Sequence, residues 1–193
     1  MPVKFDLGPD QGRSIVQKTI AELNYARGNL TARGFNQHIS KPIGIYAIRL
    51  DELLIDNTLS SVQKNGWIYV LITSNEVGQV AELHLDEKSS KVYFAQVESV
   101  QTADRFLNAV RYAENHEKVS EIDYEIRELR IPSLCFRSVW LHSGEVDEDL
   151  IIPFTPLQPS LLIETAYSKI EFFAALNSLD LTELQGGFAP ETE

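Results

Sequence analysis

The chain has 193 residues, of which 44% are hydrophobic and 23% are charged. These values are typical of a globular protein with a single core, and they exclude wholesale disorder. The formal net charge of −11 at pH 7 disfavours nonspecific binding to nucleic acid, because phosphates repel an acidic surface.

The first quarter of the chain predicts a short strand followed by a helix. Alternating apolar residues at 3–7 favour the strand, and the glycine- and proline-containing run 8–12 breaks it. The pattern Ser14-x-x-Gln17 is a capping box, and it predicts a helix that runs from there to about Gly28. We expect a loop to follow the helix.

The middle of the chain predicts mostly strands. Residues 43–50 have strand composition, whereas 50–56 fit a helical turn equally well. The run 67–73 is apolar on both faces, which indicates a central strand. Two further strands are expected at about 78–86 and 91–98, and the short turns between all three predict an antiparallel meander.

A second helix is expected from Thr102, which supplies the cap, to about Glu117. In the strand that follows, the apolar residues change phase near Arg127 and Glu128, and such a slip predicts a β-bulge. Pro132 ends that strand because proline cannot donate to the ladder.

Residues 134–142 predict another strand, and 150–153 a last one that lies at an edge or ends at its proline. Ser168-x-x-Glu171 is a second capping box and predicts a final helix. Its expected buried positions are Ile170, Phe173, Leu176 and Leu179.

This order of elements predicts an α+β fold, with a largely antiparallel sheet of about six or seven strands in two runs, packed with about three helices. Residues 1–185 are expected to form a single α+β domain, and residues 186–193 a C-terminal tail. A doubly wound dinucleotide-binding fold is disfavoured because its strands would need crossover helices.

The single cysteine, Cys135, cannot form an intramolecular disulfide, which favours a reducing compartment. Residues 1–10 lack the apolar run of a signal peptide, and no window approaches the roughly 18 to 20 apolar residues of a membrane span. We therefore expect a cytoplasmic protein with no membrane partner.

Charge is unevenly distributed along the chain. Residues 1–49 hold seven basic and three acidic residues, a net charge of +4, which leaves −15 for residues 50–193. The split suits contact between a basic N-terminal face and an acidic partner, such as another protein or a second copy of the chain. The residues expected on that face, which also forms a possible anion site, are Arg13, Ser14, Arg27 and Arg33.

Several catalytic motifs fail on spacing. Gly8-x-x-x-Gly12-Arg13-Ser14 is one residue shorter than a phosphate-binding loop and has arginine where that loop has lysine, so only a looser anion site is expected. Cys135 and His142, if on one strand, point to opposite faces about 23 Å apart at ~3.3 Å per residue. We expect Cys135 to be buried as a small apolar residue.

Two acidic segments complete the candidates. Glu82, His84 and Asp86 share a strand face but are too few to hold a metal, and we expect a solvent-facing polar surface there. The turn 145–149 lacks the spacing of a calcium loop and is expected to be solvated, with contact to a basic partner as the alternative. We expect no cofactor and no metal.

The sequence favours a non-catalytic protein-protein interaction or assembly subunit, because of its charge split. The alternative is a small-molecule-binding protein or hydrolase-like enzyme with a pocket between sheet and helices, suggested by the aromatic residues in the expected strands. Nucleic-acid binding through the N-terminal basic residues is the weakest of the three hypotheses.

Overall fold

The structure is a computed structural model that describes residues 3–26, 38–72, 77–86, 88–144, 148–157 and 160–179. Among these residues, no helix is both long and apolar enough to cross a membrane. The helices are α1 Gly12–Ala26, α2 Leu50–Asp56, α3 Val100–Glu114 and α4 Lys169–Asn177. The strands are β1 Val3–Lys4, β2 His38–Ile39, β3 Ile43–Ala47, β4 Gln63–Ile72, β5 Val77–Asp86, β6 Lys91–Val97, β7 Tyr124–Ile131, β8 Phe136–His142, β9 Leu150–Pro153 and β10 Tyr167–Ser168.

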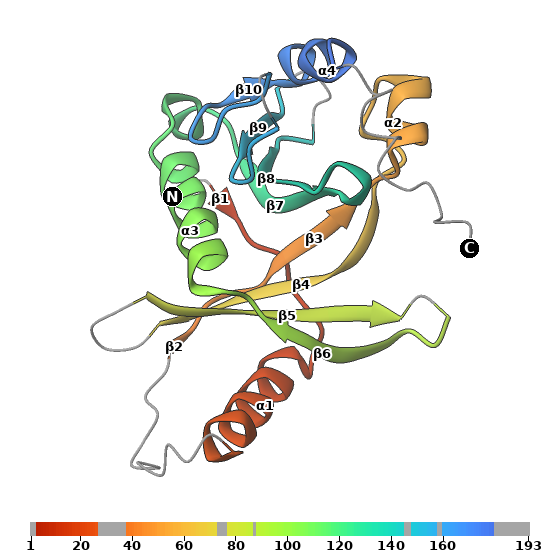
Figure 1. Cartoon of the computed structure of the whole chain (residues 1–193). Helices are drawn as coiled ribbons and strands as arrows, with labels where there is room; N and C mark the ends of the chain where they lie inside the picture. The colour runs from red at the N-terminus through yellow and green to blue at the C-terminus, as the bar shows by residue number, and fades with distance from the viewer. Residues whose placement is uncertain are drawn as a thin grey trace, which may run out of the picture.

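The strands form one open sheet in the order β10-β9-β8-β7-β3-β4-β5-β6, with β1 beside β7 and β2 beside β4. Figure 1 shows that the sheet is strongly curved, so that β7, β8 and β9 lie above β5 and β6 in this view. The sheet therefore has an inner face, on which α3 packs, and an outer face, which α1 covers below and α2 and α4 cover above.

The α+β fold and the largely antiparallel sheet are confirmed. The meander β4-β5-β6 is antiparallel throughout, whereas β7 pairs in parallel with both β1 and β3. The sheet has ten strands rather than six or seven. Of the additional strands, β2 and β10 have two residues each and are too short to show an alternating pattern, whereas β1 lies within the strand expected at 3–7.

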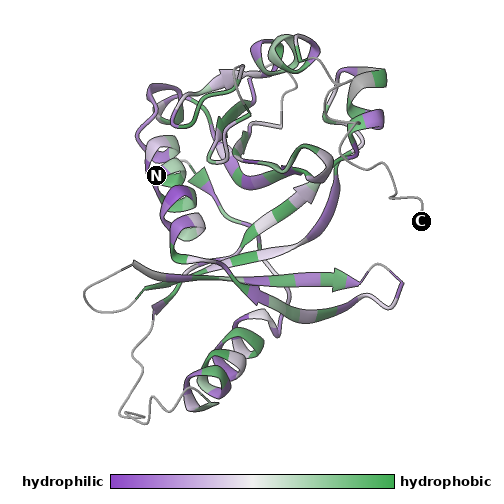
Figure 2. Ribbon diagram, viewed as in Figure 1, coloured by the Kyte–Doolittle hydropathy of each residue, from purple (hydrophilic) through white to green (hydrophobic). Residues whose placement is uncertain are grey.

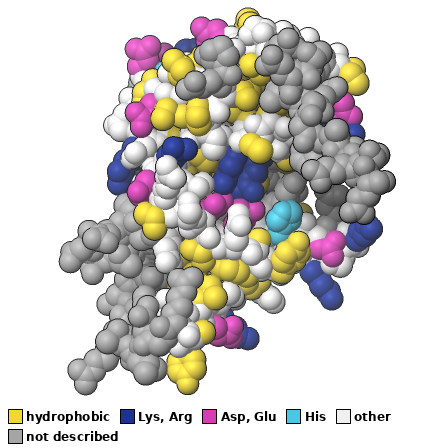
Figure 3. All heavy atoms as spheres, viewed as in Figure 1, with side chains coloured by type: hydrophobic (Ala, Val, Ile, Leu, Met, Phe, Trp, Pro, Cys, Tyr) yellow, Lys and Arg dark blue, Asp and Glu magenta, His cyan; other side chains and the backbone are white. Residues whose placement is uncertain are grey.

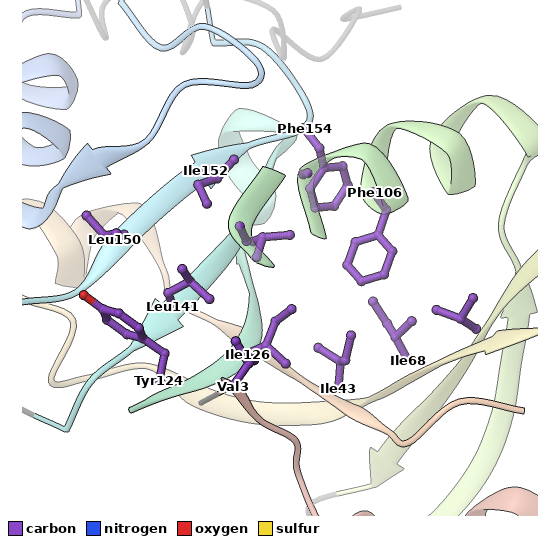
Figure 4. Close-up of a cluster of buried hydrophobic side chains, with 14 of the residues drawn as sticks. Val3, Ile43, Ile68, Phe106, Tyr124, Ile126, Leu141, Leu150, Ile152 and Phe154 are labelled. Carbon is purple, nitrogen blue, oxygen red and sulfur yellow. The ribbon is translucent and has the colours of Figure 1, made fainter. Parts of the chain in front are cut away.

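The core of the inner face joins both ends of the curved sheet to α3. Figure 4 shows Phe106 of α3 above Ile43, Ile68 and Ile126, which come from three different strands. Phe106 also meets Phe154 edge-on, with the ring centroids 5.5 Å apart. Helix α3 is amphipathic, as its colouring in Figure 2 shows, and Ser99 caps it by accepting from the Thr102 amide.

The outer face carries two separate cores. Val16 and Ile20 of α1 pack on β4 and β5 through residues such as Trp67 and Leu83. At the other end, the side chains of α2 and α4 pack on β7, β8 and β9 around Trp140. Both faces of β7 are thus buried, and this explains the change of apolar phase along it.

The predicted bulge near Arg127 and Glu128 is wrong. β7 pairs with β8 from Glu125 to Ile131 without a shift of register. Residues with even numbers face the inner core and those with odd numbers face the outer core, so apolar residues occur in both phases.

Two helix predictions also need correction. Helix α1 begins at Gly12, and the Ser14 hydroxyl donates to the Gln11 carbonyl within its first turn, so the helix starts before the predicted capping box. In α4 the capping box of Ser168 and Glu171 is confirmed. Ile170, however, is 75% exposed rather than buried.

Gly66 sets the spacing between β4 and β5. A Cβ atom at this position would lie 2.0 Å from the carbonyl oxygen of Leu83, so only glycine allows the two backbones to come this close. The approach lies beside His84, which is opposite Gly66 in the ladder.

Candidate functional site

Five charged side chains form an alternating chain on the inner face, beyond the end of the α3 core. Arg130 forms a bidentate pair with Glu82, and it shares Glu128 with Arg137, which also binds Glu98. The order is therefore Glu82, Arg130, Glu128, Arg137, Glu98. We call these residues the charge chain. In Figure 3 basic side chains lie directly above acidic ones in the middle of the molecule.

The charge chain joins the two halves of the curved sheet. Arg130 and Arg137 are directly opposite each other on β7 and β8, an arrangement that is unfavourable without a carboxylate between them. Glu128 supplies that carboxylate and is fully buried. Glu82 belongs to β5, and Glu98 follows β6, so both ends of the charge chain lie on the half of the sheet that contains β5 and β6.

Burial and pairing act against each other on the pKa of these groups. Burial alone would raise the pKa of Glu82, but the hydrogen bonds and positive charge of Arg130 outweigh it and lower the pKa. Burial would lower the pKa of Arg130, and the carboxylates of Glu128 and Glu82 raise it instead. Glu82 and Arg130 thus remain ionised at neutral pH. With three carboxylates and two guanidinium groups, the formal charge of the charge chain is −1.

An open hollow of about 450 Å³ lies on the same polar surface, at the turn end of the β5-β6 hairpin. The rings of His84 and Tyr93 stack in its wall, with centroids 5.8 Å apart and planes inclined by 17°. The Oδ1 atom of Asn65 is buried and has no hydrogen-bond partner among the described residues. The lining residues are Asn65, His84, Leu85, Asp86, Lys88 and Tyr93.

Strand β6 borders this hollow and forms one edge of the sheet. Within the described part of the chain it pairs with β5 alone. Its exposed residues are Lys91, Tyr93, Ala95 and Gln96. The opposite edge, β10, has only two residues. Ala95 is the extra residue at the register shift between β5 and β6.

The outer face carries an aromatic and polar row between its two cores. The Arg127 guanidinium lies 4.5 Å from the centroid of Tyr46 and 4.9 Å from that of Trp140, and it donates to Glu125 at 2.7 Å. These contacts and the burial of Arg127 fit a structural role, since its cation-π partners are themselves core residues.

His142 and Asp149 form the arrangement closest to a catalytic pair. The Nδ1 atom of His142 lies 3.1 Å from Asp149, which also accepts from the Trp140 indole at 2.9 Å and from the Ser143 amide at 2.9 Å. Such a carboxylate fixes the orientation of an imidazole. It equally links the end of β8 to the residue that precedes β9.

Cys135 and His142 remain excluded as a catalytic pair, but on a different ground from the one that the sequence supplies. Cys135 is not on the strand, because β8 begins at Phe136 and Cys135 adopts a left-handed conformation with φ of 49°. Its predicted burial is wrong, since the residue is exposed. The strand from Phe136 to His142 alone spans six residue steps, about 20 Å at ~3.3 Å per residue, so Cys135 and His142 lie far apart.

The N-terminal site residues divide into two groups. Arg27 and Arg33 lie outside the described residues. Arg13 donates from its guanidinium to the Ile39 carbonyl of β2, and Ser14 donates to Gln11. The neighbouring basic residues have their own intramolecular partners, namely Lys4 with Asp123, Lys18 with Glu22, Lys41 with Phe5 and Arg49 with Asp51.

Two residues of the acidic segments do not lie on the solvated surface that the sequence predicts. Glu82 is 3% exposed and Asp149 is also 3% exposed, and both carboxylates are hydrogen-bonded. Glu148 fits the expectation better, with its side chain 42% exposed beside Lys118. Residues 145–147 lie outside the described part. No group of metal-binding side chains occurs within the residues described.

Sequence reasoning missed most of the polar inner face. The sequence pattern does not single out Arg130, Arg137 and Glu128 as a set, although Glu128 and Arg130 continue the even phase of Tyr124 and Ile126. Asn65 carries no sequence signal at all. Comparisons with protein-family models, curated proteins and solved structures found no match.

Proposed function

We propose that the chain is a non-catalytic interaction protein that binds an extended segment of a partner protein along the open edge of β6. The observation that carries this proposal is a seven-residue edge strand beside a polar hollow. Addition of a strand to a sheet edge is a common mode of peptide recognition, in which backbone hydrogen bonds supply affinity and side-chain pockets supply specificity.

The composition of β6 supports this use. Natural edge strands are usually protected by short length, proline or charge. Residues 92–97, however, read Val-Tyr-Phe-Ala-Gln-Val and contain no charge and no proline. Within the described residues, the edge is protected by Lys91 and by the bulge at Ala95. Helix α1 packs under the outer face of the hairpin, through Val92, Phe94 and Val97, and so stabilises the strand against the sheet.

The partner segment is expected to be basic. The chain carries a net charge of −11, with −15 beyond residue 49, and this charge favours a positive partner. The N-terminal residues Arg13, Ser14, Arg27 and Arg33 remain a prediction for a second contact surface.

The proposal is tested by selecting random decapeptides on the immobilised chain and on the variant Ala95→Lys. The substitution places a charge on the exposed edge without altering a buried contact, because Ala95 is exposed. We expect the selection to yield peptides that bind the wild type and that bind the variant at least about tenfold more weakly. On the wild type, these peptides should protect the amides of β6 from hydrogen exchange. Equal binding to both proteins, or protection elsewhere in the chain, would overturn the proposal.

The segment that binds along β6 could also come from a second copy of the chain. The mass of the chain in solution should be measured by sedimentation at low and high salt. A dimer that Ala95→Lys dissociates would support use of the edge, with a second copy as the bound segment. A chain that is monomeric at both salt concentrations and selects no peptide would contradict an interaction role.

A further inference from the structure

The outer side of β6 carries apolar side chains that the fold covers only in part. Val92 and Phe94 are half-buried and pack against the core that α1 forms with the sheet. Leu85 and Leu83 of β5 lie opposite them in the ladder. On its other side β6 has no neighbouring strand within the part of the chain that the structure describes. Val92 and Phe94 are therefore covered from β5 and from α1 but not from the open edge.

One flank of α1 faces the same edge. Arg13 marks the opposite flank, because its guanidinium donates to the Ile39 carbonyl of β2. Leu71 of β4 pairs with β2 on one side and with β5 on the other, so β2 lies on the side of β4 remote from β6. At ~100° per residue, Ile15 and Thr19 lie about 160° and 120° around the helix from Arg13. Both are half-buried, and they lie on the flank towards β6.

A strand added to β6 would place every second side chain beside these residues. Side chains alternate between the faces of a strand, and those directly opposite each other on neighbouring strands lie ~4.5–5.5 Å apart at Cβ. The outward side chains of the added strand would therefore lie between the edge of β6 and the flank of α1. We call the residues that border this space, Ile15, Thr19, Val92 and Phe94, the α1 corner. The intervening side chains would lie on the inner face, beside the exposed Tyr93.

We propose that the β6 edge selects segments in which apolar residues alternate with basic ones, and that the α1 corner receives the apolar residues. This inference rests on the proposed strand addition and adds to it the sequence pattern of the partner. Burial of apolar surface in the α1 corner favours the apolar residues. The net charge of −11 favours basic residues between them, and it also opposes a second copy of the chain as the bound partner.

Two capped heptapeptides of identical composition and charge test this pattern. The peptide KVKFKVK places all its apolar residues on one face of a strand, whereas VKKFKKV spaces them three apart, so that successive ones fall on opposite faces. Each peptide is titrated into the full chain and followed by nuclear magnetic resonance. We expect the alternating peptide to bind at least about tenfold more tightly, and to shift the amide signals of β6 and those of Ile15 and Thr19.

A matched pair of substitutions on α1 tests the α1 corner. Thr19→Glu places a carboxylate on the flank towards β6, and Ala21→Glu places the same charge at an exposed position on another side of the helix. Either charge attracts a basic peptide, so weaker binding to Thr19→Glu reports the loss of an apolar contact. We expect Thr19→Glu to weaken KVKFKVK by at least about tenfold, and Ala21→Glu to leave it unchanged or slightly tighter. Circular dichroism confirms that both variants are folded, and the comparison of the two peptides on the wild type depends on neither.

Failure of this inference can be distinguished from failure of strand addition. Equal binding of the two peptides, no binding of KVKFKVK, or equal effects of Thr19→Glu and Ala21→Glu would overturn the alternating pattern. Strand addition is judged separately, by the selected decapeptides and Ala95→Lys. Decapeptides that bind the edge without alternating apolar residues support strand addition and contradict the inference. If Thr19→Glu weakens KVKFKVK but Ala95→Lys does not, the peptide binds α1 away from the edge, and this result contradicts both.

Discussion

At the scale of single residues, Glu128 is the centre of the charge chain. It accepts from Arg130 at 2.8 Å and from Arg137 at 2.6 Å, and it is fully buried. Glu128→Gln would leave two opposed guanidinium groups without the carboxylate between them. Removing one member of a buried ion pair costs about 3–5 kcal/mol, and we expect a loss of this size in the free energy of unfolding, measured with urea.

The control for this substitution is Glu148→Gln. The Glu148 side chain pairs with Lys118 at 3.4 Å, but both side chains are about two-fifths exposed, at 42% and 41%. Exposed pairs of this kind contribute about 0–1 kcal/mol. A Glu128→Gln variant no less stable than Glu148→Gln would show that the charge chain contributes nothing to stability.

Two buried tyrosines predict a response to alkaline pH. Burial raises the pKa of Tyr69 to about 12 and, with the charges of Glu148 and Asp149, raises that of Tyr124 to about 12. A raised pKa means that the neutral form stabilises the fold. This stabilisation is complete below the model-peptide value of 10 and is lost as the pH rises towards 12.

The measurement is absorbance at a tyrosinate wavelength across this pH range. Tyr124→Phe should remove one late-titrating group and also the hydrogen bond that the hydroxyl donates to the Glu148 carbonyl at 2.9 Å. Ionisation of every tyrosine in a single step near pH 10, with the protein still folded, would contradict the assignment.

At the scale of elements, the capping box of α4 is the clearest local device. Ser168 accepts from the Glu171 amide, and the Glu171 carboxylate accepts from the Ser168 amide at 2.8 Å. Ser168→Ala should lower the free energy of unfolding by about 1 kcal/mol. Glu171→Gln keeps an acceptor in place and should cost less. Equal losses in urea unfolding for both variants would contradict this ranking.

The capping box of α4 is an example of the local features that the sequence predicts well. Periodicity and caps are local properties, so β5, β6 and the start of α4 lie close to their predicted positions. The prediction is less accurate for β4, which begins at Gln63 rather than 67, and for α3, which Ser99 caps in place of Thr102. Helix α1 differs at its start because Gly12 packs against the Tyr69 hydroxyl, where a Cβ atom would lie 2.2 Å away. That contact involves a strand far along the chain.

The candidate site could not be predicted in this way. Glu82 and Arg130 are 48 residues apart and meet only because the sheet curves. The side-chain oxygen of Asn65, which has no partner among the described residues, and the hollow that Asn65 lines both depend on how the strands pack, and the sequence pattern records neither. The change of phase on β7 was visible, but its cause is burial on both faces, which requires knowledge of the layers.

At the scale of the whole molecule, the two halves of the curved sheet are expected to unfold together. Hydrogen bonds run continuously from β8 through β7, β3 and β4 to β5, and the charge chain closes the polar side of the curve. The core around α3 also includes residues from both halves. A single cooperative transition follows from shared contacts of this kind.

The chain provides its own reporters for this prediction, because it has two tryptophans, one in each outer core. In Trp140→Phe, fluorescence reports only the α1 side through Trp67, and in Trp67→Phe it reports only the α2 and α4 side through Trp140. In each variant we expect the urea midpoint of fluorescence to coincide with that of far-ultraviolet circular dichroism. Adding Glu82→Gln should lower both midpoints together, because Arg130 loses its charged partner on β5. If fluorescence changes before circular dichroism in either variant, the halves unfold separately and the charge chain does not couple them.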